Sequence, residues 1–363
     1  MRYTIDSTKS TPAYLQLYLQ VREDIVNGLY TYGEKLPSKR TVADDVGVST
    51  VTVEHAYALL CDEGYAEARE RSGFFVLFRT EEGFAAPSHP AVSRSVPHSH
   101  SDDSPEFPLS VLTRTMRAVL SDYERRILER SPNCGTFELR DAIRKYLARS
   151  RGISAECEQI IIGSGSEYLY GLIVELLGRD CVYAIESPSY KKIEHVYGAW
   201  GVIPEHLPLG NDGIESAALR DSSAQVLHIS PYRSFPSGVT ASASKRHEYL
   251  RWAQQGKRYI IEDDFESEFS VSKKAEETLF SHTRNDNVIY MNTFSKTLSS
   301  SFRIGYTVLP KHLVAEFEKR LGFYSCTVPT YMQFVLAALM ENGDFERHIN
   351  RVRRKKRKEL FGK

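Results

Sequence analysis

Lys296 lies among small hydroxyl residues in the run from Asn292 to Tyr306, and Arg303 follows it seven positions later. A lysine forms an imine with an aldehyde only as the free amine, so it needs a site that desolvates it or lowers its pKa. Hydroxyls, backbone N–H groups and a guanidinium can hold a phosphate by charge-assisted hydrogen bonds. The spacing suggests a lysine beside a bound phosphate, although the pair alone fits a solvated lysine in a polar loop better.

Three further segments with reactive side chains follow short apolar runs. Residues 163–166 (Gly-Ser-Gly-Ser) precede a helical pattern, and backbone N–H groups at a helix start can hold a phosphate. Tyr190 places an aromatic ring just past the turn around Pro188, and the run 262–264 (Glu-Asp-Asp) brings a carboxylate that can keep a pyridine nitrogen protonated. Each has a simpler interpretation, because Tyr190 also suits a core, Asp263 a capping position and Ser166 an N-cap.

The elements that must position these residues are strands. From residue 107 onward, short apolar runs alternate with helical patterns, and the runs are 159–163, 181–186, 225–230, 258–264, 287–292 and 305–309. Such alternation is typical of an α/β fold with a mostly parallel sheet, in which ligands bind at the carboxyl ends of the strands. We therefore expect Lys296, Asp263, Tyr190 and the 163–166 loop at one edge of a sheet.

The first 78 residues have a different pattern. Apolar residues recur at helical spacing from 14 to about 28, Ser38 can cap a second helix, and Ser49 can cap a third from Thr50 to about 63. Gly47 lies between the second and third helices, which is typical of a helix-turn-helix. Residues 66–77 follow as two short strands around a turn at 70–73, which predicts a wing.

Composition narrows the classes of protein. The chain has 363 residues, with 47 basic and 47 acidic side chains, so no global field favours nucleic acid or a membrane. Five cysteines without a C-x-x-C pair argue against zinc and against a disulfide framework. Residues 80–106 are rich in Ser, Pro and His, which predicts a flexible linker, and we expect no metal at its histidines His89, His98 and His100. No run is long enough to span a membrane, so we expect a soluble cytoplasmic protein.

Residues 10–78 resemble the winged helix-turn-helix of GntR-type bacterial regulators. The matching segments are 36–40 (Leu-Pro-Ser-Lys-Arg), 47–53 (Gly-Val-Ser-Thr-Val-Thr-Val) and 72–76 (Ser-Gly-Phe-Phe-Val). The resemblance implies that the third helix enters the major groove of double-stranded DNA. It places Thr50, Thr52 and His55 toward bases, and four cations toward phosphates or the minor groove: Lys39, Arg40, Arg69 and Arg71. Residues 1–80 nevertheless carry nine basic and eleven acidic side chains, a net charge of −2.

Residues 107–361 resemble the fold-type I aminotransferase-like domain of pyridoxal-phosphate proteins, and the whole chain resembles a MocR-type regulator. The resemblance rests on an ordered series of motifs, at 133–140, 163–166, 186–190, 235–240, 262–264 and 293–296. It implies pyridoxal 5'-phosphate as cofactor, with Lys296 as the imine-forming lysine and Arg303 as the phosphate-binding arginine. It also implies cofactor contacts from Gly165, Ser166, Tyr190, Asp263, Thr293 and Ser295.

Several positions depart from that family. Phe265 stands where a tyrosine usually bonds the cofactor, Arg233 and Ser234 replace a histidine and a glutamine, and Glu167 replaces a glutamine after the phosphate-loop serine. Glu167 would repel a phosphate if it turned inward. Residues 344–361 match the helix that leads into a smaller C-terminal domain, and the chain stops two residues later. We therefore expect most of that domain, with its carboxylate-binding arginine, to be missing.

These features predict three regions: a winged helix-turn-helix at 10–78, a flexible linker at 79–106 and an aminotransferase-like domain at 107–363. The leading hypothesis is a homodimeric transcriptional regulator whose cofactor domain senses an amine or amino acid and transmits the change to DNA. The alternative is an aminotransferase with a fused DNA-binding domain, against which Phe265 and the missing small domain argue. A third possibility is an inactive relic that binds DNA only.

Overall fold

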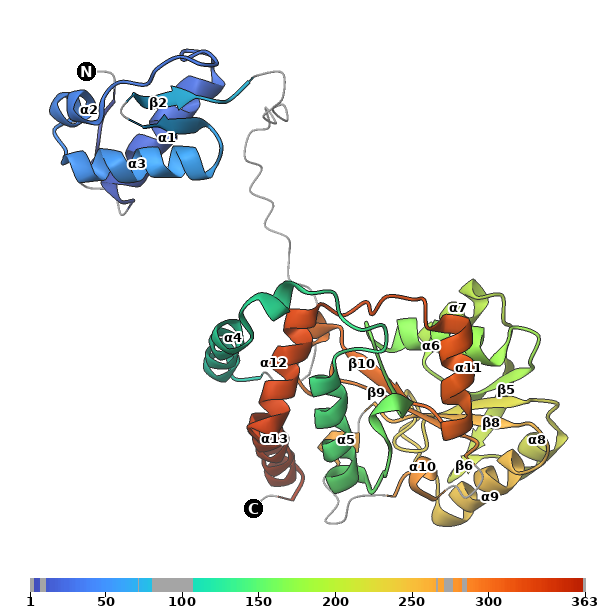
Figure 1. Ribbon diagram of the computed structural model, residues 1–363. Helices are drawn as coiled ribbons and strands as arrows, with labels where there is room; N and C mark the ends of the chain where they lie inside the picture. Colours follow the sequence, from blue (N-terminus) through green and yellow to red (C-terminus); the bar gives the residue numbers. More distant parts are fainter. Residues whose placement is uncertain are drawn as a thin grey trace. The chain divides into compact units, whose positions relative to one another are not determined.

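The computed structural model describes residues 3–6, 11–70, 72–79, 107–265, 267–270, 277–282 and 286–361. The chain divides into two compact units, Met1–Ser99 and His100–Lys363 (Figure 1). The predicted linker lies outside the described residues except for Arg79, and the predicted DNA contact Arg71 lies outside them as well.

The described residues of the N-terminal unit form three helices and a two-stranded sheet: α1 (Ala13–Val26), α2 (Lys39–Val46), α3 (Thr50–Asp62), β1 (Ala66–Arg69) and β2 (Gly73–Val76). Ser38 accepts a hydrogen bond from the backbone N–H of Thr41, and Ser49 accepts one from Thr52, so both predicted caps are confirmed. Gly47 ends α2 with φ +74°, a left-handed conformation that suits glycine. The winged helix-turn-helix is therefore present.

The core of this unit fixes α3 against its neighbours. Leu17 and Val21 of α1 pack with Val53 and Ala56 of α3, and all four side chains are buried. The hydroxyl of Tyr57 donates a hydrogen bond to the carbonyl of Pro37 at 3.0 Å. This bond ties α3 to the turn that starts α2.

The C-terminal unit is built on an eight-stranded sheet with the order β3-β10-β9-β8-β7-β4-β5-β6. The strands are β3 (Ile160–Gly163), β4 (Tyr183–Ser187), β5 (Glu205–Gly210), β6 (Gly213–Ile214), β7 (Val226–Ile229), β8 (Tyr259–Asp263), β9 (Val288–Thr293) and β10 (Gly305–Val308). Strands β10 and β6 run opposite to the other six strands of this sheet, which share one direction. The six predicted strands and the mostly parallel sheet are confirmed, whereas β5 and β6 were not predicted.

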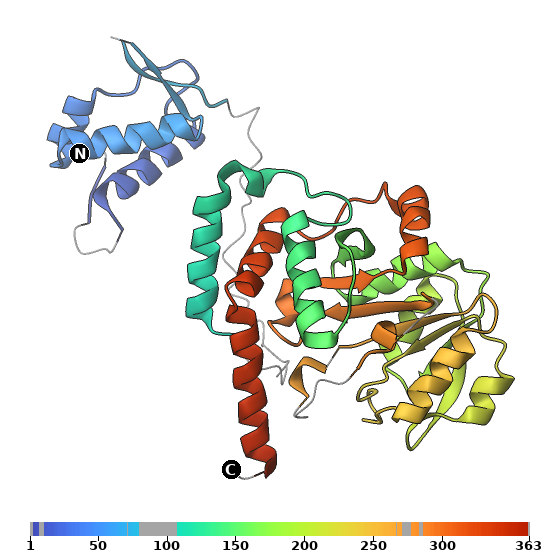
Figure 2. The same ribbon diagram turned by 60° about the horizontal axis from the view of Figure 1, so that its bottom comes forward.

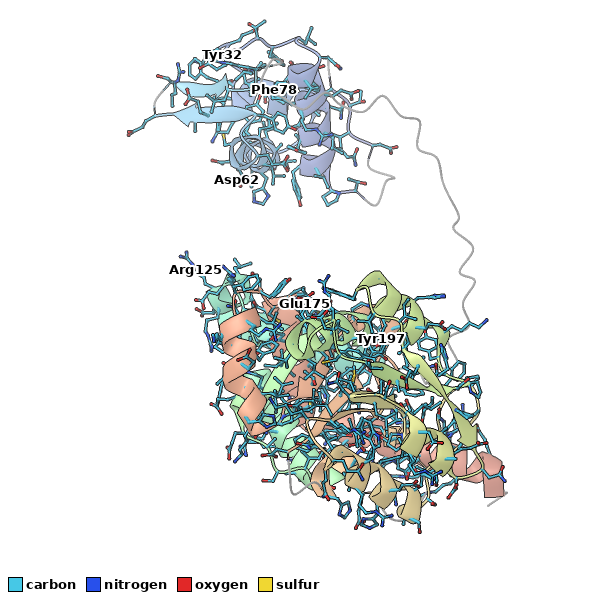
Figure 3. All side chains as sticks on the ribbon, turned by 90° about the vertical axis from the view of Figure 1, so that its right-hand side faces the viewer. Tyr32, Asp62, Phe78, Arg125, Glu175 and Tyr197 are labelled. Atoms are coloured by element: carbon cyan, nitrogen blue, oxygen red, sulfur yellow. The ribbon has the colours of Figure 1, made fainter. Side chains whose placement is uncertain are left out.

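Alternate residues of the strands face two separate helical layers. Ile160, Ile162 and Tyr290 pack in one apolar cluster with α5 (Phe137–Arg151), α9 (Ala243–Ala253) and α12 (Thr330–Glu341). Ile161 and Met291 pack in the other cluster, with α6 (Ser166–Leu177), α7 (Lys191–Ala199) and α11 (Lys311–Leu321). Because the strands other than β5 are buried on both faces, most of their residues are apolar. Side chains fill these layers, as Tyr197 does inside the second one (Figure 3).

The remaining helices extend the first layer or connect strands. They are α4 (Leu109–Tyr123), α8 (Ser216–Asp221), α10 (Leu279–His282) and α13 (Asp344–Phe361), with the 3₁₀ turns η1 (Glu124–Leu128), η2 (Cys157–Gln159), η3 (Ser267–Phe269) and η4 (Ser300–Phe302). Helix α12 contacts α4, α5 and α13 (Figure 2). These helices cover the face of the sheet opposite α6. Because helices cover both faces, the carboxyl ends of the parallel strands are the place for a site.

Candidate functional site

Three of the predicted segments meet because β10 runs antiparallel between β3 and β9. Gly305 at the start of β10 lies opposite Gly163 at the end of β3 and opposite Thr293 at the end of β9. Arg303, two residues before Gly305, therefore reaches the same edge as the loops that follow β3 and β9. We call this edge, where β3, β4, β7, β8 and β9 end, the carboxyl edge of the sheet.

The loop at 163–167 and Arg303 are in direct contact. Gly165 is buried with φ +95°, and a Cβ placed on it would lie 3.1 Å from Nη2 of Arg303. A side chain at this position would therefore press on the guanidinium as well as strain the backbone. Ser166 is the first residue of α6, so the backbone N–H groups of that helix start lie beside the guanidinium. This combination of donors suits a phosphate.

Glu167 also faces this place and is held by two cations. Its Oε2 lies 3.3 Å from Nη2 of Arg303, and its Oε1 lies 2.7 Å from Nζ of Lys192 at the start of α7. The hydrogen bond from Lys192, with the charge of Arg303, lowers the pKa of Glu167. The carboxylate anticipated from the sequence is thus beside the predicted phosphate-binding arginine.

Asp263, the last residue of β8, is buried and has a defined set of partners. Its Oδ2 accepts a hydrogen bond of 2.6 Å from the hydroxyl of Tyr170 and lies 3.5 Å from Nε2 of His228. The other ring nitrogen of His228 is 2.7 Å from the hydroxyl of Tyr197. The remaining oxygen of Asp263, Oδ1, has no hydrogen-bond partner among the described residues although it is buried. An acceptor in that state suits a protonated ring nitrogen of a ligand.

The other predicted cofactor residues reach the carboxyl edge without bonding to Asp263 or Arg303. Lys296 and Ser295 lie half-buried in the turn after β9, and Thr293 is buried as the last residue of that strand. Within the described part of the chain, the Lys296 ammonium has no ion pair. Tyr190, which precedes α7, is 40% exposed, and its ring meets Phe235 edge-on at 5.8 Å.

The positions that depart from the family also lie at or near this edge. Phe265 follows β8 and is half-buried. Ser234, which replaces a glutamine of the family, donates a hydrogen bond of 2.6 Å to Oε2 of Glu186, and the backbone N–H of Ser230 donates to the same oxygen. Burial raises the pKa of Glu186 to about 7. Arg233 adopts a left-handed conformation with φ +47°.

Four residues of the site were not anticipated from the sequence: Tyr170, Lys192, Tyr197 and His228. His228 carried a usable signal, because a polar residue inside the apolar run 225–230 needs a buried partner. The tyrosines carried none, since apolar helix faces contain tyrosine for packing alone. Lys192 was indistinguishable from a solvated lysine.

In the N-terminal unit, the exposed face of α3 is only partly the predicted one. Thr50 and His55 are exposed, and so are Val51 and Glu54, which are not among the predicted base contacts. The ring of His55 packs edge-on against Tyr14 at 5.4 Å. Thr52 is half-buried and its hydroxyl is 2.8 Å from that of Ser49. The base contacts proposed for these residues remain predictions.

Two of the described cations of this unit pair with carboxylates at its surface. Nζ of Lys39 lies 2.8 Å from Oε1 of Glu54, and Nη2 of Arg69 lies 2.6 Å from Oε1 of Glu67. Arg40 is exposed. Such exposed pairs are weak, so the cations can exchange carboxylate for phosphate.

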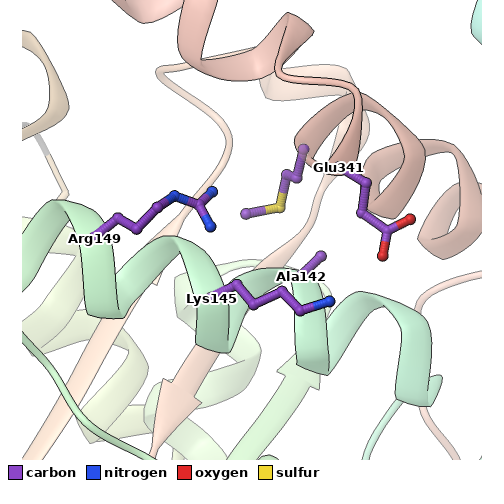
Figure 4. Close-up of a pocket in the computed structure, with 5 residues that line it drawn as sticks. Ala142, Lys145, Arg149 and Glu341 are labelled. Carbon is purple, nitrogen blue, oxygen red and sulfur yellow. The ribbon is translucent and has the colours of Figure 1, made fainter.

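A pocket of about 250 Å³ lies elsewhere, between α5 and α12, and is lined by Ala142, Lys145, Arg149, Met340 and Glu341 (Figure 4). None of the predicted cofactor residues lines it, so the candidate site is at the carboxyl edge instead. The described residues contain no group of three or more His, Cys, Asp or Glu side chains suited to a metal ion. No helix in the described ranges is both long and apolar enough to cross a membrane.

Comparison with protein families matches each unit separately. Residues 13–76 match "Bacterial regulatory proteins, gntR family", and residues 104–361 match "Aminotransferase class I and II". The second match covers more than half of the chain. The class of protein is therefore a gntR-family helix-turn-helix joined to an aminotransferase class I and II domain.

Similar proteins share both parts. The chain is 31% identical to the uncharacterized HTH-type transcriptional regulator YdeL of Bacillus subtilis (strain 168), over 98% of this chain and 79% of that protein. It is 26% identical to the probable rhizopine catabolism regulatory protein MocR of Rhizobium meliloti, over 96% of this chain and 76% of that protein. The chain belongs to the MocR-type family of HTH-type transcriptional regulators.

The solved structures support the fold of the larger unit. A multiple substrate aminotransferase from Thermococcus profundus superimposes with a TM-score of 0.62 at 24% identity, over 68% of this chain and 64% of that one. Pyridoxal 5'-phosphate is the cofactor of the aminotransferase class I and II family, and the residues at the carboxyl edge fit it. Gly165 and Arg303 leave a cradle that a Cβ would fill, and Asp263 offers a buried unpartnered acceptor.

Proposed function

We propose that this chain is a DNA-binding transcriptional regulator whose larger unit holds pyridoxal 5'-phosphate and senses a small amine or amino acid. The observation that carries the proposal is the unpartnered Oδ1 of Asp263, buried at the same sheet edge as Lys296 and Arg303. The family places such a domain behind a gntR-type helix-turn-helix. A regulator bound to the bacterial chromosome works in the cytoplasm.

Each residue has a distinct task in this proposal. Arg303, Ser166 and the N–H groups at the start of α6 would hold the phosphate, with Thr293 and Ser295 as further hydroxyl donors. Asp263 would accept from the ring nitrogen, and Tyr190 would cover the ring. When bound, the cofactor supplies an aldehyde that reacts reversibly with primary amines. Lys296 would supply the resident amine and would be displaced when an effector amine arrives.

The Asp263 network, comprising Asp263, Tyr170, His228 and Tyr197, explains how the acceptor stays in place. Tyr170 donates to Oδ2, which leaves Oδ1 available to accept from a ligand. His228 is in turn fixed by Tyr197. Such outer partners restrict the rotation of the carboxylate, so the acceptor is ready before a ligand binds.

For DNA binding, we propose that α3 enters the major groove with Thr50, Thr52 and His55 near base edges. Lys39, Arg40, Arg69 and Arg71 would contact the phosphates, which set affinity and orientation more than sequence preference. A homodimer would present two such units to two half-sites. Displacement of Lys296 by an effector would change the population of the dimer's two arrangements and so the spacing of the helices.

The test of the cofactor site is a visible absorption band that borohydride reduces, in purified full-length chain incubated with pyridoxal 5'-phosphate. We expect the band in the wild type and in Lys311→Ala, a matched exposed-lysine control on α11, and its loss in Lys296→Ala. Absence of the band from the wild type, or its retention in Lys296→Ala, would overturn the cofactor part of the proposal.

The test of the output is footprinting on the DNA upstream of the chain's own coding region, with and without added amines. DNA protection that changes when an amine is added supports the regulator. Lys296→Ala should still protect the DNA but should no longer respond to the amine. Multiple turnovers of amino acids without any protected DNA would instead favour the aminotransferase alternative. The half-buried Phe265, which lacks the hydroxyl usual at its position, favours the regulator.

A further inference from the structure

We propose that Glu167 is an internal competitor for the phosphate-binding arginine, and that Lys192 controls how strongly it competes. This inference rests on the proposed function, because it assigns Arg303 to the phosphate of the ligand. A phosphate monoester would then enter by exchanging with the Glu167 carboxylate at Arg303. Occupancy of the site would follow the concentration of the phosphate ester.

The geometry divides the carboxylate between two cations. Glu167 lies in the first turn of α6, and its Oε2 is 3.3 Å from Nη2 of Arg303. Its Oε1 is 2.7 Å from Nζ of Lys192, which lies on the separate helix α7. The shorter contact is the one to Lys192, so Glu167 can release Arg303 while it keeps a partner.

A phosphate cannot share Arg303 with Glu167 at no cost, since the two anions repel each other at such short range. The repulsion would be far smaller with the glutamine that the family usually has at this position. Gly165 adds to the constraint, because a Cβ at this position would lie 3.1 Å from Nη2 of the same guanidinium. Both anions would therefore need the same guanidinium.

Exposure makes this an exchange and not a permanent block. The side chains of Glu167, Arg303 and Lys192 are 37%, 49% and 49% exposed. Solvent screens ion pairs of this kind, and their net strength is low. A dianionic phosphate that also accepts hydrogen bonds from the backbone N–H groups at the start of α6 should displace one such carboxylate.

Lys192 also links the two ends of the site. It follows Tyr190 by two residues, and its Nζ lies 5.9 Å from the centroid of the Tyr190 ring. The same ammonium thus contacts both the competing carboxylate and the ring that is expected to cover the ligand. A ligand that stacks on Tyr190 would therefore change the surroundings of Lys192, the cation that draws Glu167 away from Arg303.

The experiment measures binding of inorganic phosphate and of pyridoxal 5'-phosphate to the full chain by calorimetry. We expect Glu167→Gln to bind both about threefold to tenfold more tightly, as for loss of one exposed competing ion pair. Glu175→Gln, the same change further along α6 at a residue paired with Arg179, should leave both affinities unchanged (Figure 3). Equal or weaker binding by Glu167→Gln would overturn the inference.

A double-mutant cycle then tests the role of Lys192. In the wild-type background, Lys192→Met should weaken phosphate binding. Glu167 would then have Arg303 as its sole cation and would compete more strongly with the phosphate. In the Glu167→Gln background the same change should have little effect, since no competitor remains. An equal loss in both backgrounds would mean that Lys192 binds phosphate directly and would overturn its assigned role. Failure of the proposed function is seen separately, as absence of the borohydride-reducible band in every variant.

Discussion

Two sets of charged residues lie at the carboxyl edge of the sheet, and they differ in burial. Asp263 is 3% exposed and is held by Tyr170, while its neighbour Asp264 pairs with Arg151 at 2.7 Å in an equally buried place. Glu167, Arg303 and Lys192 form the second set and remain more than a third exposed. The first set is fixed by its partners, whereas the second can change partners.

This difference assigns different tasks to the two ends of the proposed ligand. A buried carboxylate cannot easily lose its partners, so it provides a preorganised acceptor that is always in place. An exposed carboxylate and guanidinium exchange with solvent anions and respond to concentration and salt. We infer that the ring end of the site determines which ligand fits and that the phosphate end determines when it is bound.

The largest expected effect tests the buried set. Arg151→Met should lower the free energy of unfolding by about 3–5 kcal/mol, because it leaves Asp264 buried without its cation. The matched control is Arg149→Met on the same helix, whose side chain is 54% exposed and pairs with Glu346. Urea unfolding of both variants measures the contrast. Similar losses in the two variants would mean that burial does not separate the two sets.

A smaller effect is expected inside the Asp263 network. Tyr170→Phe should lower the free energy of unfolding by about 1.5–3 kcal/mol, since a hydrogen bond to a buried carboxylate is lost. Tyr168→Phe, two residues earlier on α6, should have little effect because its hydroxyl has no bond to a described residue. The same urea titration compares them, and a loss in Tyr168→Phe as large as in Tyr170→Phe would contradict the assignment.

Glu186 is a further buried carboxyl group, and it should make the free energy of unfolding depend on pH. Burial raises its folded-state pKa to about 7, above the value of about 4.3 for an unfolded chain. Between these values the folded state binds a proton that the unfolded state has lost. The stabilisation is therefore complete below about pH 4 and is lost as the pH rises toward 7, by about 1.4 kcal/mol per pH unit.

Glu186→Gln should flatten this slope, because its amide oxygen can still accept from Ser230 and Ser234 but no longer titrates. Glu194→Gln on α7 is the control, since the Glu194 side chain is 50% exposed. Urea unfolding from pH 5 to pH 8 gives the slopes. A slope that Glu186→Gln leaves intact would assign the pH dependence to other groups.

The sequence predicts the fold well where burial leaves a pattern. The six predicted strands are short apolar runs, because both of their faces are covered by helices. Strand β5 was missed because Glu205, His206 and Pro208 interrupt the apolar pattern at the side of the sheet, and β6 is only two residues long. The caps Ser38 and Ser49 were predictable because capping depends on local residues alone.

The candidate site divides in the same way. Strand ends could be located from the sequence, so Lys296, Asp263 and Tyr190 could be placed at one edge in advance. The partners could not, because Tyr170 bonds to Asp263 from 93 residues away and no local pattern records that contact. Glu167 was recognised as unfavourable for phosphate, but only the structure shows that it pairs with Arg303 and Lys192.

The smallest effect on stability is expected for the exposed charges of the N-terminal unit, which should behave like the phosphate end of the site. The Lys39 and Glu54 side chains are 38% and 58% exposed, so Lys39→Gln should leave the unfolding midpoint unchanged. It should still reduce the slope of log affinity against log salt by about 1 for the footprinted duplex, because one phosphate contact is lost.

Glu54→Gln should instead tighten binding, since Lys39 no longer exchanges one anion for another. Fluorescence anisotropy across a salt series measures both. If Lys39→Gln destabilises the unit or leaves the salt slope intact, Lys39 is a structural residue. The Lys39–Glu54 pair would then not exchange its carboxylate for a phosphate as the Glu167–Arg303 pair is proposed to do.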